Sequence, residues 1–349
     1  MNKDIQVKTK VNQNPINIME KRGVRQVITA TVGLAIICIG FSLINENFYS
    51  RANIANLLRQ IAPILLIGIA ESFVLITGNF DLSIGSIVGV SAMFSGTLMS
   101  RGILPPIATV FVTMTVCLII GLVNGILVAH FKVPAFIATL GTMTISRGLA
   151  QLVNNNYNTD AITKFFPEQA EAFKNVFYYG KTLGIYNGVV ISILCMIIFS
   201  FILSSTKSGR HMYAVGSNAE SARMSGVNVT VTICKAYIIS AFCSCIVGFI
   251  TCATVGQGTM DAGGGYEMYA VAASVIGGVS TLGGYGLLIG TSVGAAIWGV
   301  LQNGLQFAGA PIALRNIVIG IIVVLSVMLD IFVQQGKGGK KSKSSAKAN

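Results

Sequence analysis

Long apolar runs separated by short polar connections occupy almost the whole chain. Ten of them approach the roughly 20 residues that a helix needs to cross a bilayer. The runs are continuous and do not alternate apolar with polar residues, which predicts helices and not the strands of a barrel. They are Val27–Ile44, Leu57–Thr77, Ile84–Ser100, Ile103–Ala129, Val133–Val153, Leu183–Ser205, Ile233–Val255, Tyr269–Leu282, Leu287–Gln306 and Ile317–Phe332. The sequence therefore predicts an all-α fold, a polytopic membrane bundle of about ten spans.

Glycine lies inside these runs as well as between them, and the chain has 39 glycines. Small residues let helix backbones approach closely in lipid, so this density predicts tight packing. The run Tyr269–Leu282 is short, follows Gly263-Gly264-Gly265 and is interrupted by Gly277-Gly278. This pattern predicts a broken or re-entrant helix.

Composition and charge agree with a membrane protein and suggest its orientation. Of 349 residues, 53% are hydrophobic and 10% charged, against about 25% charged in soluble domains. The net charge is +12, and a cytoplasmic start places sixteen of the 24 basic residues inside, as the positive-inside rule requires. The other eight are Arg51, Arg59, Arg101, Arg147, Lys164, Lys174, Lys181 and Arg315. We expect a multi-pass protein of the bacterial cytoplasmic (inner) membrane with both termini in the cytoplasm.

Three parts follow from this distribution. Residues 1–26 form a polar cytoplasmic arm, and no cleavage site follows the first apolar run, so that run is expected to be retained. Residues 27–334 form the transmembrane domain. Residues 335–349 form a basic cytoplasmic tail, which suits a topology anchor near anionic lipid better than a nucleic-acid arm.

The sequence lacks the residue patterns of an enzyme or a metal site. It has two histidines, no His-Glu-x-x-His motif and no Cys/His spacing suited to zinc. All seven cysteines lie in or beside apolar runs, as small hydrophobic residues do. We expect no catalytic residue, no metal and no cofactor.

Two polar segments stand out between the apolar runs. Residues 206–235, with the stretch KSGRHMYAVGSNAESARMSGVNVTVTICK from Lys207 to Lys235, are long enough for short helices. They predict a handle for a separate soluble protein, which favours a pump or transporter subunit over a simple channel. The second segment, from about Asn154 to Thr182, is either an external docking surface or a solvated connection.

Polar residues within or next to the apolar runs are candidates for a substrate path. In the stretch from Thr77 to Ser86, Asp81, Ser83 and Ser86 can cap the following helix or lie beside the path. An ionisable residue inside a span should face the bundle interior, so Glu71 can line the path or pair with Arg147, which can also snorkel to the outer boundary. The candidates are Glu71, Asn79, Asp81, Ser83, Asn124, Thr139, Thr142, Glu267 and Asn303.

Four segments carry a resemblance to a known family: TGNFDLSIGS, VPAFIATLGTMTISRGL, GRHMYAVGSNAESARMSGVNV and GGGYEMYAVAASVIGGVSTLGG. They resemble, in order and spacing, the signature segments of bacterial ABC sugar-importer permeases of the ribose, galactose, xylose and autoinducer-2 type, in the superfamily of branched-chain permeases. The similarity runs from about Asn47 to Phe332. Many relatives have an aspartate where this chain has Tyr269, which signals a different subgroup or substrate.

The resemblance implies a permease of about ten helices, homodimeric or paired with a second permease subunit, with the path at the subunit interface. It also implies a cytoplasmic ATP-binding subunit and an extracytoplasmic sugar-binding protein. The loop matching Gly209–Val229 would seat in the ATPase. Its family positions are Gly209, Arg210, Gly216, Asn218, Glu220, Ala222, Arg223 and Gly226, and Ser217 or Asn218 can cap a short helix there.

The resulting hypothesis is an ABC importer permease for a monosaccharide or related polyol, working by alternating access. One alternative is a permease of the same type for nucleosides or branched-chain amino acids. Another is an ion-coupled secondary transporter with Glu71 as its coupling acid, and a membrane enzyme would lack any convergent catalytic set.

Overall fold

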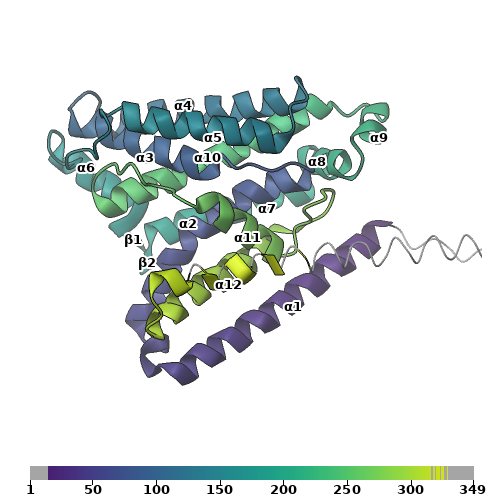
Figure 1. Cartoon of the computed structure of the whole chain (residues 1–349), viewed down its shortest axis with the longest axis horizontal. Helices are drawn as coiled ribbons and strands as arrows, with labels where there is room; N and C mark the ends of the chain where they lie inside the picture. The colour runs from purple at the N-terminus through teal and green to yellow at the C-terminus, as the bar shows by residue number, and fades with distance from the viewer. Residues whose placement is uncertain (1–14, 316, 319, 323, 326–327, 329–349) are drawn as a thin grey trace, which may run out of the picture.

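The computed structural model describes residues 15–328 apart from 316, 319, 323, 326 and 327. Almost all regular structure in this part of the chain is helical, with one short hairpin (Figure 1). The all-α prediction is confirmed.

The first half of the chain forms mainly long helices. They are α1 (Pro15–Ile44), the 3-10 turn η1 (Glu46–Tyr49), α2 (Arg51–Ile76), α3 (Ile84–Ser100), α4 (Pro106–Ala129) and α5 (Ala135–Leu152). The second half contains α6 (Pro167–Lys174), the π-helical turn η2 (Asn175–Tyr179), β1 (Lys181–Thr182), β2 (Ile185–Tyr186), α7 (Asn187–Ser205), α8 (Lys207–Ser217), α9 (Ala219–Met224), α10 (Val229–Val255), α11 (Tyr266–Ile276) and α12 (Leu288–Phe307).

These helices lie where the apolar runs predicted them. Five in the described part are long and apolar enough to cross a membrane: α1 over Val27–Ile44, α2, α4, α7 and α10. Shorter apolar helices are α3, α11 and the segment Ile312–Ile322. The predicted broken span is confirmed as a short helix, because α11 has only 11 residues.

The predicted part boundaries fall at the edge of what the structure describes. Helix α1 begins at Pro15, so it includes the last residues of the predicted arm. Residues 1–14, the tail 335–349 and the end of the run Ile317–Phe332 lie outside the described residues. The boundaries at 26 and 334 stay predictions.

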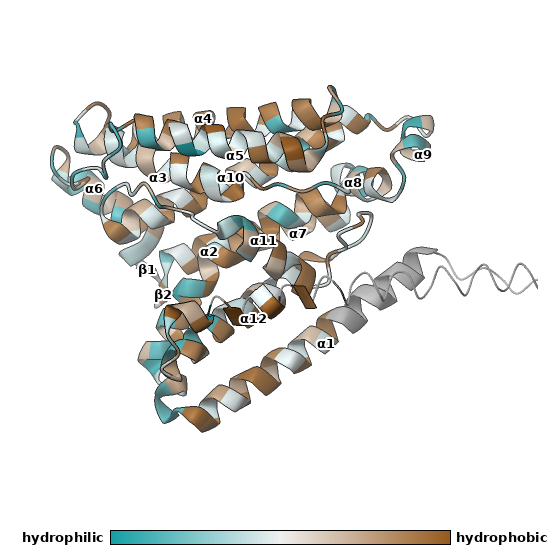
Figure 2. Cartoon of the chain, in the orientation of Figure 1, coloured by the Kyte–Doolittle hydropathy of each residue, from teal (hydrophilic) through white to brown (hydrophobic). Residues whose placement is uncertain are grey.

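Helix α10 is at the centre of the bundle and contacts α2, α3 and α4. Figure 1 shows α4 and α5 along one side, and α12 and α1 along the other. The short helices α8 and α9 lie at one end, and α6 with the hairpin at the opposite end. We call these the α8–α9 end and the α6 end. Hydrophilic residues gather at both ends, and apolar residues cover the helices between them (Figure 2).

Side chains and glycines set the helix ends as local chemistry requires. The Ser50 side chain accepts the Asn53 N–H at the start of α2, and Asn228 accepts the Val231 N–H at the start of α10. Gly256 ends α10 with a left-handed φ of 77°. These caps replace the hydrogen bonds that helix termini lack.

Helices α4 and α10 pack through glycine against backbone. A methyl group placed on Gly121 would lie 2.6 Å from both the Tyr237 carbonyl oxygen and the Ala241 Cβ, and one on Gly125 would lie 2.6 Å from the Cys234 Cα. Only glycine fits this approach, as in the small-xxx-small pairs of membrane helices.

The variant Gly121→Val should therefore lower the stability of the purified protein. Overpacking of a tight contact costs about 1–3 kcal/mol, here by separating α4 from α10. The measurement is the melting temperature in detergent, followed by loss of the monodisperse peak. The matched control is Gly40→Val, because Gly40 is exposed on α1 with no atom near its missing side chain. Equal melting of both variants would contradict the packing argument.

Candidate functional site

Two acidic side chains meet inside the bundle near the α8–α9 end. Glu71 in α2 is fully buried, and Asp81 lies in the non-helical connection to α3 with 1% exposure. The Asp81 N–H donates to Glu71 Oε2 over 3.3 Å. Asp81 Oδ1 accepts the Ser83 N–H at 2.9 Å, and Asp81 Oδ2 accepts the Ser240 hydroxyl of α10 at 2.7 Å. Asp81 thus ties the α2–α3 connection to α10.

The same contacts continue into α4 and α5. Asn124 of α4 donates to the Ser83 hydroxyl at 2.8 Å and accepts the Thr142 hydroxyl of α5 at 2.7 Å. We call Glu71, Asp81, Ser83, Asn124, Thr142 and Ser240 the buried polar network. Its members are all buried, so it holds four helices in register and does not line an open path in this conformation.

The predicted cap of the helix after Asp81 takes a different form. Ser83 occupies the N-cap position of α3, but its side chain accepts no N–H of the first turn. Ser83 and Asp81 bond each other, and the Ser86 hydroxyl donates to the Ser83 carbonyl. The cap is supplied by Asp81, whose Oδ1 accepts the Ser83 N–H directly before α3, and Asp81 and Ser83 also make contacts with α10 and α4.

Of the alternatives for Glu71 and Arg147, pairing with each other is not observed. Glu71 bonds the Asp81 backbone, whereas Arg147 Nη1 donates to the Ala262 carbonyl at 2.6 Å. Arg147 is half-buried against α3 and the α10–α11 connection. The two ionisable residues therefore belong to separate polar regions.

Thr139 contacts the buried polar network only through its carbonyl, which accepts the Thr142 hydroxyl at 3.1 Å, and Asn79 and Asn303 lie apart from it. The Thr139 hydroxyl bonds the Ala135 carbonyl of its own helix, and Asn79 bonds Thr77. Asn303 of α12 and Asn53 of α2 exchange two hydrogen bonds of 2.9 and 3.1 Å. These contacts assign the three candidates to local structure and packing.

Glu267 is the acidic candidate that remains partly exposed. It lies in the first turn of α11, where a carboxylate is favoured, and its Oε2 has no hydrogen-bond partner. Tyr269, two residues later, packs on Trp298 with ring centroids 4.7 Å apart. The aromatic ring fills space between α11 and α12 at this position.

Several polar partners were not singled out in the sequence. Ser72 contacts the Ser274 hydroxyl at 3.1 Å and the Thr291 hydroxyl at 2.8 Å, which joins α2, α11 and α12. Ser240 and Asn53 complete the contacts described above. Each of these residues is an isolated hydroxyl or amide within an apolar run. Such a group is costly in lipid without a hydrogen-bond partner, and this could have marked them in the sequence.

The polar segment at the α8–α9 end folds as two short helices. Asn218, one of the two predicted capping residues, accepts the Ser221 N–H at 2.8 Å and starts α9. Glu220 and Arg223 form an ion pair of 2.7 Å, and each side chain is 68% exposed. Ala222 is buried beneath them, and Gly226 leaves α9 with a φ of 81°. The exposed pair presents charge to any partner at this end.

Helix α8 rests on two non-helical connections of the bundle. A methyl group on Gly216 would collide with the Ile76 carbonyl and lie 2.6 Å from the Gly284 nitrogen. The Tyr213 hydroxyl donates to the Gly286 carbonyl at 2.6 Å, and burial together with the nearby Tyr285 raises the pKa of Tyr213. The remaining predicted residues lie at the start of α8, with Gly209 buried against Leu203 and Arg210 bonded to the Ser205 carbonyl.

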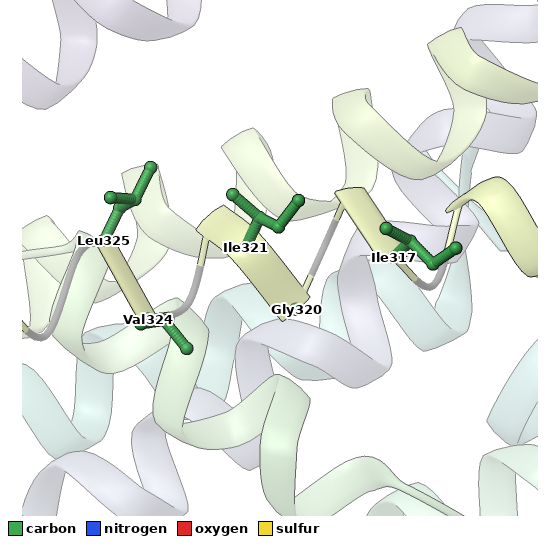
Figure 3. A pocket seen from close by; sticks show the side chains of 5 residues that line it. All are labelled: Ile317, Gly320, Ile321, Val324 and Leu325. Carbon is green, nitrogen blue, oxygen red and sulfur yellow. The ribbon is translucent and has the colours of Figure 1, made fainter.

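One surface hollow lies on the last helical segment and is wholly apolar. Figure 3 shows its lining, formed by Ile317, Gly320, Ile321, Val324 and Leu325. A polyhydroxylated solute needs hydrogen-bonding groups, so this hollow suits lipid or another helix. Within the described residues, no group of three or more His, Cys, Asp or Glu side chains could hold a metal ion.

Removing the amide of Asn124 should destabilise the bundle. Asn124→Leu removes two hydrogen bonds that join α4 to Ser83 and to Thr142, which costs about 0.5–1.5 kcal/mol for each bond. The Ser83 hydroxyl keeps its bond to Asp81 and the Thr142 hydroxyl keeps its bond to the Thr139 carbonyl. Thermal unfolding in detergent measures the loss. Thr115→Val on the same helix is the control, because this exposed hydroxyl bonds only its own helix at the Phe111 carbonyl. A melting temperature for Asn124→Leu as high as that of the control would overturn the role of the network.

Comparison with known proteins identifies the family. The family described as "Branched-chain amino acid transport system / permease component" matches residues 53–327. The chain is 33% identical to the ribose import permease protein RbsC of Bacillus subtilis, over 88% of this chain and 94% of the relative. It is 31% identical to the D-allose transport system permease protein AlsC (86% and 90%) and 32% to the galactose/methyl galactoside import permease protein MglC (82% and 88%), both of Escherichia coli K12. The chain therefore belongs to this permease family, as a membrane transport subunit of the ABC sugar-importer type that its four motifs resemble.

Proposed function

We propose that this chain translocates a monosaccharide or related polyol across the cytoplasmic membrane by alternating access. It works as the permease subunit of an ABC importer, as a homodimer or paired with a second permease. A separate cytoplasmic subunit hydrolyses ATP, and an extracytoplasmic binding protein delivers the sugar. The observation that carries this proposal is the match to sugar permeases along most of both chains.

The relatives support a sugar without choosing one. Their names cover ribose, allose, fructose and galactose at 30–33% identity, which is too narrow a range to rank them. Monosaccharides of the ribose, galactose or xylose type share a ring of hydroxyl groups. The proposed substrate class is defined by that common chemistry.

The α8–α9 end supports contact with an ATPase. Its two short helices carry an exposed ion pair, and α8 rests on the connections after α2 and after α11. A push on α8 would therefore reach both connections through backbone contacts. The proposed orientation places this end and both termini in the cytoplasm, in agreement with the positive-inside count.

The alternatives receive less support from the geometry. An ion-coupled transporter using Glu71 needs an accessible acid, but Glu71 is fully buried in this conformation. Nucleosides and branched-chain amino acids remain the competing substrates for a permease of this family. Competition assays separate them from sugars.

The first experiment is affinity purification from the native membrane in mild detergent, followed by mass spectrometry. We expect an ATP-binding subunit and an extracytoplasmic binding protein to copurify. The assembled complex in proteoliposomes should then take up D-ribose, D-galactose or D-xylose only with ATP. Uptake that needs an ion gradient and no ATPase would overturn the proposal.

Charge reversal in α9 tests the coupling role. Glu220→Lys or Arg223→Glu should lower ATP-driven uptake about fivefold or more, because the charges face the ATPase. Membrane insertion should be unchanged, since an exposed ion pair contributes about 0–1 kcal/mol to stability. The readout is uptake per ATP hydrolysed.

The double variant Glu220→Arg/Arg223→Glu is the matched control. It restores an ion pair within α9 but presents the charges in exchanged positions. We expect no recovery of uptake. Full recovery would show that the pair only stabilises α9 and that its charges contact no partner.

A further inference from the structure

The connection between α10 and α11 enters the bundle without forming a helix. It lies along α3, where three close approaches follow one another: Gly258 meets Gly96, Ala262 meets Gly89, and Gly263 meets Gly85. At the α6 end of the bundle, Thr159 holds the start of this connection, because its N–H donates to the Gly258 carbonyl at 2.9 Å. The segment therefore descends beside α3 before α11 begins.

Helix α11 is too short to span a bilayer alone. Its 11 residues extend about 16 Å, roughly half of a hydrocarbon core. The connection after α11 reaches Gly78 and Ser217 at the α8–α9 end. The non-helical segment thus completes the crossing, and α11 begins partway between the two ends.

One face of this segment is open. Asp261 and Gly264 are exposed, and Met268, in the first turn of α11, is 57% exposed. Non-helical backbone at membrane depth is tolerated where it is buried in protein or lines water. An exposed carboxylate on such backbone therefore faces water and not lipid.

Two further charged groups flank this open face. Arg147 of α5 donates from Nη1 to the Ala262 carbonyl at 2.6 Å. A methyl group on Gly85 would collide with Glu267 Oε2 and lie 3.5 Å from Arg147 Nη2, so both side chains pack on the same glycine. No ion pair joins them within the described residues, and Glu267 Oε2 has no hydrogen-bond partner.

The exposed surface of α5, the helix that carries Arg147, is mixed. Phe136, Ile137, Ile145 and Leu152 are exposed and apolar, as are the exposed residues of α4 and α7. Thr144 and Gly141 are also exposed on α5. Most of this helix therefore suits lipid, and its polar surface is confined to Thr144, Arg147 and the open segment beside them.

We propose that Arg147 and Glu267, beside the open segment Met260–Gly265, bind the hydroxyl groups of the sugar as it crosses the membrane. This inference rests on the proposed function and names the residues of its path. The guanidinium donates to hydroxyl oxygens, and the carboxylate accepts from hydroxyl hydrogens. A vicinal diol both donates and accepts, so one pair of hydroxyls satisfies both side chains.

This assignment separates the path from the buried polar network. Glu71, Asp81 and Asn124 are buried and have no more than 1% of their surface to offer a solute, whereas Arg147 and Glu267 are partly exposed. Asp261 adds a second carboxylate, so the region carries one positive and two negative charges. That balance opposes an anionic substrate and accepts a neutral polyol.

Uptake by the complete importer in proteoliposomes tests the proposal. Arg147→Met and Glu267→Gln should each lower sugar uptake about tenfold or more through a raised KM, because each removes a charged hydrogen-bonding partner. Arg147→Lys should recover part of the loss. ATP hydrolysis should stay near wild type in both variants. Glu267→Gln should also keep the wild-type melting temperature, which distinguishes binding from a structural role. Arg147→Met also loses the donor to the Ala262 carbonyl, so its uptake is compared with that of Arg147→Lys, which keeps a donor.

The matched controls are Arg51→Met and Glu46→Gln, exposed charges at the α6 end with the same chemical change. They should keep wild-type uptake. Wild-type uptake by Arg147→Met and Glu267→Gln would overturn this inference and leave the proposed function standing. If the wild type takes up no sugar, the proposed function fails.

Water access gives a second test that needs no transport. Met268→Cys should react with a membrane-impermeant thiosulfonate in proteoliposomes, and D-ribose or D-galactose should slow the reaction. Ile197→Cys on α7 is the control, because its side chain has the same 57% exposure on an apolar face. It should not react. Equal rates at the two positions would overturn the water-lined path.

Discussion

The whole arrangement depends on the contact of glycine with backbone, which holds two non-helical segments inside an apolar bundle. In lipid, unpaired backbone groups are costly, and hydrophobic association between helices is weak. Close approach supplies both dispersion contact and shelter for the irregular chain. The α10–α11 segment packs against Gly85, Gly89 and Gly96 of α3. Gly78, Gly216 and Gly283 contact one another at the α8–α9 end.

The two non-helical segments differ in their side-chain hydrogen bonds and in their exposure. The α2–α3 connection is fixed by hydrogen bonds among Asp81, Ser83 and Ser240, which are all buried. The α10–α11 segment has few side-chain partners and one open face. The α2–α3 connection is therefore held in place by its hydrogen bonds. The α10–α11 segment, which also lies against α3, has a face that solvent can reach.

The fold was largely predictable because each span must carry its own apolar residues. Continuous runs predicted the helices, and the glycines around Tyr269–Leu282 predicted the short α11. The partners of polar residues were not predictable, because Ser240, Asn124 and Asp81 are far apart in sequence. The local pattern of Asp81 and Ser83 predicted the hydrogen bond at the start of α3 but not their contacts with α4 and α10. The contact of Arg147 with the Ala262 carbonyl was not predictable either, because no local pattern in the sequence shows that non-helical backbone lies beside it.

The position of α1 has a consequence for how the chain is assembled. Helix α1 packs mainly on α12, so it meets its main neighbour only after the helices between them have been made. Until then it must be stable alone in lipid, and its span Val27–Ile44 lacks any charged residue. Helix α2, which carries Pro63 and Glu71, has no such independence and needs α10 and α11 around it. Insertion of α1 and its packing against α12 are thus separate events. The ribosome translates some 240 residues, between Ile44 and Leu288, in the interval between them.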